Sequence, residues 1–130
     1  MSRAFLDTNV LLYTLDGTRR GDRARRALLD GYAISVQVLN EFARVARRKQ
    51  LLSADELWDV ESRFRQLLLV TPLTVELHDA ALHLSARYGF HLYDSLIVAS
   101  AQETECDVLY TEDLQHNQRI EGLRVVNPFR

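Results

Sequence analysis

Short apolar runs separated by longer helical patterns extend through the whole of this 130-residue chain. This alternation constrains the fold more than any other feature, because it is typical of an α/β domain with a mostly parallel sheet. It predicts a central sheet of about five strands with helices between them. The strands are expected near residues 4–7, 32–35, 69–71, 108–110 and 124–127.

Local signals mark where some of the helices begin and end. Asp22 could cap a helix that continues to Asp30, with Gly31 just past its end. Ser53 and Glu56 have the spacing of a capping box, which predicts a helix from there to about residue 68. A further helix is expected over residues 37–49. The sequence contains no repeat, no low-complexity tract and no linker, so residues 1–130 are predicted to form a single domain.

Composition narrows the class of protein. The chain is 47% hydrophobic and 26% charged, which is ordinary for a soluble globular protein. No apolar run approaches the roughly 20 residues that span a bilayer, and the N-terminus lacks the apolar core of a signal peptide. The single cysteine, Cys106, excludes an internal disulfide and a cysteine metal cluster. A cytoplasmic protein without a membrane partner is therefore expected.

Four acidic residues stand at positions where acids are uncommon. Asp7 ends the first apolar run, and Asp113 follows the run at 108–110. Glu41 borders the apolar face of the helix at 37–49, and Asp94 opens the apolar stretch at 96–99. Ligands of open parallel sheets gather at the carboxyl ends of the strands. We therefore expect the four acids to lie near one another at that edge.

The chemistry of such a cluster follows from its charge. A carboxylate in apolar surroundings is unfavourable unless it is paired or bound to a metal, and no matching set of basic residues lies beside these four in the sequence. Mg²⁺ and Mn²⁺ prefer oxygen ligands. One or two such ions can activate water and stabilise charge during phosphodiester cleavage. The four acids thus predict a Mg²⁺ or Mn²⁺ site that hydrolyses phosphodiester bonds.

Each acid also has a simpler explanation when it is taken alone. Asp7 and Asp94 could cap helices, Glu41 could lie on an ordinary helix flank, and Asp113 could be a turn residue. The coincidence of four acids at compatible edges favours the metal site. Other sites find no support, because HExxH, Gly-x-Ser-x-Gly, P-loop and Gly-x-Gly-x-x-Gly motifs are all absent. A phosphoacceptor signalling module needs a lysine near the late strands, whereas the only lysine is Lys49.

Four segments that contain these acids resemble the motifs of PIN-domain ribonucleases, and their order and spacing are most similar to VapC-type toxins. The segments are LDTNVLLY at 6–13, SVQVLNEF at 35–42, YDSLIVASA at 93–101 and YTEDLQH at 110–116. The resemblance extends from residue 4 to the C-terminal segment 125–129. It implies a three-layer α/β/α PIN-like fold and a Mg²⁺- or Mn²⁺-dependent endoribonuclease, the toxin of a type II toxin–antitoxin pair.

The resemblance also implies roles for individual residues and partners. It assigns the metal site and catalysis to four residues, Asp7, Glu41, Asp94 and Asp113. It places three polar residues beside them, Thr8, Asn9 and Thr111, where they could orient ligands or water. Glu112 is a neighbouring acid, but the Thr-x-Asp spacing favours Asp113. The implied partners are an RNA substrate, a cognate antitoxin and a second copy of the chain. The alternative is a catalytically silent PIN-like module that binds RNA or protein.

Two clusters of basic residues contrast with the net charge of −2. If the acids gather at a metal, the remaining surface is net positive, which would suit a phosphate backbone. In the first cluster, Arg19, Arg20 and Arg23 are the candidate RNA contacts, and a solvated helix face is the alternative. The second cluster contains Arg44, Arg47, Arg48 and Lys49.

Overall fold

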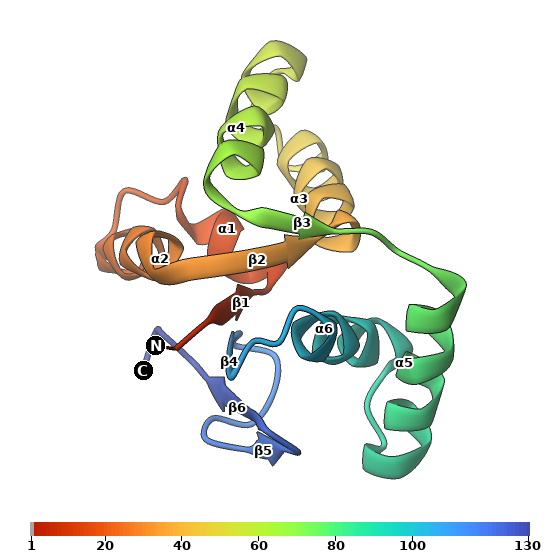
Figure 1. Ribbon diagram of the computed structural model, residues 1–130. Helices are drawn as coiled ribbons and strands as arrows, with labels where there is room; N and C mark the ends of the chain where they lie inside the picture. The colour runs from red at the N-terminus through yellow and green to blue at the C-terminus, as the bar shows by residue number, and fades with distance from the viewer. Residues whose placement is uncertain (1) are drawn as a thin grey trace.

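The computed structural model describes residues 2–130 and contains one six-stranded sheet in the order β3-β2-β1-β4-β6-β5 (Figure 1). Neighbouring strands are parallel from β3 to β6, and β5 is antiparallel to β6. The mostly parallel sheet is therefore as predicted. The strands are β1 (Ala4–Leu6), β2 (Gly31–Ser35), β3 (Leu69–Thr71), β4 (Val108–Tyr110), β5 (Arg119–Ile120) and β6 (Leu123–Val126).

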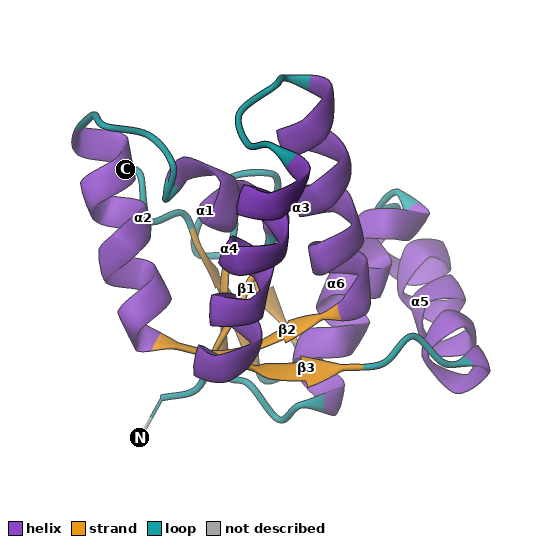
Figure 2. Ribbon diagram, turned by 90° about the horizontal axis from the view of Figure 1, so that it is seen from above, coloured by secondary structure: helices purple, strands orange, loops and turns teal. Residues whose placement is uncertain are grey.

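Helices cover both faces of this sheet and give the three-layer α/β/α arrangement. Figure 1 shows α1 and α2 on one side of the sheet and α5 and α6 on the other. Helix α3 packs against α1, and α4 packs against α3, as Figure 2 also shows. The helices are α1 (Thr8–Tyr13), α2 (Arg19–Asp30), α3 (Val36–Arg48), α4 (Ala54–Leu67), α5 (Val75–Tyr88) and α6 (Leu92–Glu103).

The core consists of the predicted apolar runs. Phe5 and Leu109 from the central strands are fully buried, as are Val38 and Phe42 from α3 and Val98 from α6. Strands buried on both faces read as continuous apolar runs, which is why the sequence located them closely. Within residues 2–130, no helix is long and apolar enough to cross a membrane.

The start of α2 differs from the prediction. The N-cap is Thr18, four residues before the predicted cap Asp22, which lies in the first turn of the helix. Gly31 does not adopt the left-handed conformation expected after a helix but has φ −70° and ψ 143° and begins β2. A Cβ atom on Gly31 would lie 2.6 Å from Leu6 Cδ1, so this glycine permits close packing of β2 on β1.

The sixth strand, β5, was not predicted. It pairs with β6 across a two-residue turn, Glu121-Gly122, in which Glu121 has φ 57°. Left-handed conformations are typical of such tight hairpin turns. The capping box of Ser53 and Glu56 is present as predicted, with both of its hydrogen bonds formed.

Candidate active site

Asp7 lies at the carboxyl end of the central strand β1 and is 5% exposed. Its backbone N–H donates to the carbonyl oxygen of Tyr110 at the end of β4, 3.0 Å away. Its Oδ1 accepts the backbone N–H of Thr8 at 2.7 Å, so Asp7 is the N-cap of α1. The alternative prediction that Asp7 caps a helix is therefore confirmed. The same contact fixes one carboxylate oxygen at the strand edge and leaves lone pairs available on both oxygens.

Thr111 connects Asp7 to the loop after β4. This residue is fully buried, and its hydroxyl donates to Asp7 Oδ2 at 2.8 Å. The same hydroxyl oxygen accepts the backbone N–H of Asp113 at 3.0 Å. Thr111 thus holds the buried carboxylate and turns the chain so that Asp113 stands beside it.

Asn9 makes the second connection between α1 and this loop. Its Nδ2 donates to Asp113 Oδ2 at 3.1 Å and to Thr111 Oγ1 at 3.3 Å, while its Oδ1 accepts the backbone N–H of Glu112 at 3.4 Å. These three bonds satisfy most of the amide's capacity. The three predicted supporting residues therefore lie among the acids and form hydrogen bonds with them.

Glu41 joins the group from α3. The hydroxyl of Thr8 donates to Glu41 Oε2 at 3.2 Å, and Gln37 Nε2 donates to Glu41 Oε1 at 2.8 Å. Asp94 comes from the first turn of α6, where His91 rather than Asp94 is the N-cap. The capping explanation for Asp94 is therefore wrong, and its carboxylate forms no hydrogen bond among the described residues.

The acids influence one another electrostatically. Burial raises the pKa of Asp7 from 3.8 to about 7; the hydrogen bonds from Thr111 and Thr8 oppose this shift, and the charges of Asp113 and Glu41 add to it. Burial also raises the pKa of Asp94, as do the charges of Asp113 and Glu41, while His91 opposes the increase. Glu41 and Asp113 therefore lie close enough to both Asp7 and Asp94 to raise the pKa of each. Perturbed acids of this kind are frequent at functional sites.

The four carboxylates are the kind of ligand that a hard divalent cation prefers, but their side chains do not converge on one point in this structure. Within residues 2–130, no three His, Cys, Asp or Glu side chains converge closely enough to hold a metal ion. Three of the four carboxylates are held by hydroxyl or amide donors, however, and none of the four forms an ion pair with Arg or Lys in this part of the chain. Oxygen-only ligands and uncompensated charge suit Mg²⁺ or Mn²⁺.

The predicted RNA-contacting arginines lie close to this site. Arg19, Arg20 and Arg23 line a hollow of about 260 Å³ together with Glu112 and Phe129. The guanidinium of Arg20 stands over the ring of Tyr13, 4.7 Å from its centroid, and the Tyr13 hydroxyl donates to Glu112 Oε1 at 2.7 Å. The three arginines therefore form one basic surface, and Glu112, which lines the same hollow, directly precedes Asp113 in the sequence.

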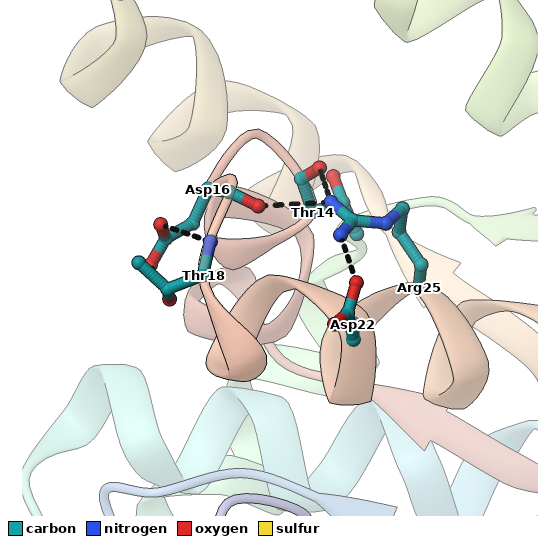
Figure 3. Close-up of polar contacts among 5 residues, drawn as sticks. All are labelled: Thr14, Asp16, Thr18, Asp22 and Arg25. Atoms are coloured by element: carbon teal, nitrogen blue, oxygen red, sulfur yellow. Dashed lines mark hydrogen bonds and ion pairs between the residues drawn. The ribbon is translucent and has the colours of Figure 1, made fainter.

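Arg25, in the same basic cluster, has a structural role. Figure 3 shows its guanidinium between the loop after α1 and the first turns of α2. Nη1 donates to the carbonyl oxygens of Thr14 and Asp16, both at 2.9 Å, and Nη2 pairs with Asp22 at 2.6 Å. The side chain of Asp16 accepts both the N–H and the hydroxyl of Thr18. Arg25 thus holds the loop between α1 and α2 against the helix that carries the other arginines.

Two features of the site were missed from the sequence. Gln37 is 6% exposed and connects Glu41 with the backbone of α6, since its Nε2 also donates to the Tyr93 carbonyl oxygen at 3.2 Å. The four-residue spacing of Gln37 and Glu41 was the available signal. The second missed feature is the hydrogen bond between Tyr13 and Glu112. No local sequence pattern indicates it, because the two residues are 99 positions apart.

Comparison with known proteins places this geometry in a family. The PIN domain model matches residues 4–120, so the chain belongs to the PIN-domain family. Curated protein sequences give no significant match. The chain's fold is similar to that of a toxin–antitoxin complex from Klebsiella pneumoniae, with 23% identity, a TM-score of 0.75 and coverage of 96% of this chain and 97% of that chain.

Two further solved structures have the same fold. VapC20 from Mycobacterium tuberculosis, a sarcin-ricin loop cleaving toxin, is 19% identical, with a TM-score of 0.69 and coverage of 85% of this chain and 89% of that chain. DNA-bound VapBC from Salmonella typhimurium is 24% identical, with a TM-score of 0.68 and coverage of 96% and 97%. At these identities the likeness establishes a shared fold.

Proposed function

We propose that residues 1–130 form a single metal-dependent endoribonuclease domain and that the protein is the VapC-type toxin of a type II toxin–antitoxin pair. The observation that carries this proposal is the buried Asp7 carboxylate, which is held by Thr8 and Thr111 and lies within the electrostatic influence of Glu41 and Asp113, with no Arg or Lys paired to these acids within residues 2–130. Membership of the PIN-domain family and the likeness to VapC structures support it. The cytoplasm is the expected compartment.

The four acids would hold Mg²⁺ or Mn²⁺, which supplies an activated water and charge stabilisation for phosphodiester hydrolysis. Thr8 and Thr111 orient Asp7 and link it to Glu41 and Asp113. Preorganised ligands of this kind bind more tightly because little order is lost on binding. The basic surface of Arg19, Arg20 and Arg23 would hold the RNA backbone beside the acids.

Partners of two kinds are part of the proposal. A hollow of about 610 Å³ adjoins Asn9 and Glu112 and is lined by Leu12, Leu15 and Leu51 among others. An apolar segment of an antitoxin would bury these leucines and cover the approach to the acids. A homodimer would bury other exposed apolar side chains, such as Val75 at 73% exposure.

The deciding experiment is cleavage of a mixed structured RNA by the purified protein with Mg²⁺, with Mn²⁺ and with chelator. Asp7→Asn and Asp94→Asn should reduce cutting by about 100-fold or more, since even outer-shell partners of metal ligands are worth about 10–100-fold. Asp59→Asn, an exposed acid on α4, is the matched control and should cut normally. Equal cutting with chelator, or cutting that survives in both site variants, contradicts the proposal. A folded protein that binds metal and RNA but never cuts indicates the silent module.

A further inference from the structure

A third hollow borders Glu41 between α3 and α6. It has a volume of about 470 Å³ and is lined by Gln37, Asn40, Glu41, Arg44, Leu73, Tyr93 and Leu96. This volume is within the range of roughly 300–1,000 Å³ that is typical of small-molecule and cofactor sites. The hollow shares one residue, Glu41, with the candidate metal site.

The polar wall of this hollow comes from one face of α3. Gln37, Asn40, Glu41 and Arg44 are spaced at three and four residues, so their side chains lie in a row along the helix. The buried faces of the same helix carry Val38 and other apolar residues. Asn40 and Arg44 in this row are exposed, whereas Gln37 is buried. The row presents two amides, a carboxylate and a guanidinium to the hollow.

Tyr93 forms the opposite wall and is 67% exposed. It directly precedes Asp94, so its ring stands one residue from a candidate metal ligand. An exposed aromatic ring beside a charged catalytic group is a stacking platform for an unpaired nucleobase. Leu73 and Leu96 also line the hollow and add apolar surface to it.

Gln37 makes the hollow rigid and leaves one polar atom unsatisfied. Its Nε2 donates to Glu41 and to the Tyr93 carbonyl oxygen, which ties α3 to α6. Its Oε1 is buried without a hydrogen-bond partner among the described residues. Buried acceptors are normally satisfied, so this one indicates a missing donor at the wall of the hollow.

Arg44 and Asn40 are the remaining polar groups, and both are exposed. None of the ion pairs found within residues 2–130 involves Arg44, although Glu41 is only one helical turn away. A guanidinium left free in this way is suited to a phosphate oxygen. The amide of Asn40 carries both donors and an acceptor, which matches the edge of a base.

We propose that this hollow binds one unpaired nucleotide of the RNA next to the cleaved phosphate, an inference that rests on the proposed nuclease function. The base stacks on Tyr93, its edge contacts Asn40, and its phosphate contacts Arg44. The arginine surface around Arg20 borders Glu112, which precedes Asp113, while the hollow borders Glu41, so the strand runs past the acids between the two. The substrate is accordingly a loop or single-stranded segment, because a base inside a duplex is already stacked between its neighbours.

The test is binding of fluorescently labelled five-nucleotide RNAs, A5, C5, G5 and U5, in chelator so that no cutting occurs. Tyr93→Ala should weaken binding of at least one oligonucleotide by roughly tenfold or more, as expected for the loss of one stacked base. Tyr93→Phe should restore much of this loss, since it keeps the ring. Asn40→Ala should change the order of preference among the four bases, and Arg44→Gln should reduce the salt dependence of binding.

Two matched controls come from α4, where Trp58 and Arg65 are exposed. Trp58→Ala and Arg65→Gln should bind all four oligonucleotides as the wild type does. Unchanged binding in Tyr93→Ala overturns the subsite, even where wild-type cleavage persists. Loss of self-association in Tyr93→Ala with unchanged RNA binding assigns the hollow to a second copy and also overturns it. Tyr93-dependent binding by a protein that never cuts supports the subsite and refutes only the nuclease.

Discussion

Replacing Asp7 by asparagine should stabilise the metal-free protein at neutral and alkaline pH. In the folded chain the pKa of Asp7 is raised from 3.8 to about 7, chiefly by burial. Below pH about 4 the carboxyl group is protonated in the folded and the unfolded chain alike. Between pH 4 and 7 the unfolded chain loses this proton while the folded chain retains it, so the free energy of unfolding falls as the pH rises.

The size of the effect follows from the two pKa values. The difference between 3.8 and about 7 corresponds to about 4 kcal/mol, because each pKa unit is worth about 1.4 kcal/mol. Asparagine is neutral at every pH and can accept the Thr8 N–H as aspartate does, but it leaves the Thr111 hydroxyl without its acceptor. The lost hydrogen bond reduces the gain by about 1 kcal/mol. We therefore expect Asp7→Asn to unfold at a temperature about 10 °C above the wild type at pH 8 in chelator.

Thermal unfolding followed by circular dichroism from pH 4 to pH 8 measures this difference. The gain should vanish near pH 4, and Asp59→Asn should follow the wild type throughout as the control for simple charge removal. Asp94, whose pKa is raised in the same direction, leaves a residual pH slope in Asp7→Asn. If Asp7→Asn is less stable than the wild type by the same amount at every pH, the hydrogen bonds of Asp7 outweigh its burial and the reasoning fails.

The other predictions concern metal, loop geometry and the orientation of Asp7. Saturating Mg²⁺ or Mn²⁺ should raise the unfolding temperature of the wild type at pH 8 and leave that of Asp7→Asn unchanged. Scanning calorimetry measures both temperatures, and a wild type whose unfolding temperature does not change with metal would count against a metal site. Arg25→Ala should lower the free energy of unfolding by about 1–3 kcal/mol, because two carbonyls and Asp22 lose their donor; urea titration measures it, and full stability in Arg25→Lys would show that the forked geometry is unimportant. Gly21→Ala should be strongly destabilising, since the new Cβ would lie 1.8 Å from a backbone carbonyl oxygen, and a soluble variant with wild-type unfolding would contradict the packing of α2 on the preceding loop. Thr111→Val should shift the pH profile of metal-dependent cleavage to higher pH, because the Thr111 hydroxyl lowers the pKa of Asp7, and an unmoved profile would mean that another group sets it.

The sequence predicted the central strands well because burial dictates them. Phe5, Leu6 and Leu109 are fully buried, so their apolar runs could not belong to surface segments. Strand β5 was not predicted because it has only two residues, one of them an exposed arginine, and so short a segment shows no hydrophobic periodicity. The start of α2 was misplaced because Thr18 provides no side-chain capping bond and the helix opens with two arginines, so the acid of its first turn, Asp22, has the signature of a cap itself.

The candidate site was predictable to the extent that strand ends determine it. Asp7 and Asp113 follow neighbouring parallel strands, and parallel pairing brings such residues together without further information. The contributions of α3 and α6 depend on how the helices pack. Gln37 forms its bond with the Tyr93 carbonyl oxygen across 56 residues of sequence, and no local pattern encodes that contact. The hollow between these helices could therefore be found only in the folded chain.

The capping and the metal-binding explanations of Asp7 are compatible, and their combination accounts for the motif. The Thr8 N–H takes one lone pair of Oδ1 and the Thr111 hydroxyl takes one of Oδ2, so each oxygen keeps another for a cation. The Thr8 hydroxyl reaches Glu41, while Asn9 reaches Asp113. Thr8 and Asn9 thus orient carboxylates of the cluster, while Asp7 is the N-cap of α1. A helix N-terminus also favours negative charge, so the short helix α1 stabilises the same carboxylate that a cation would bind.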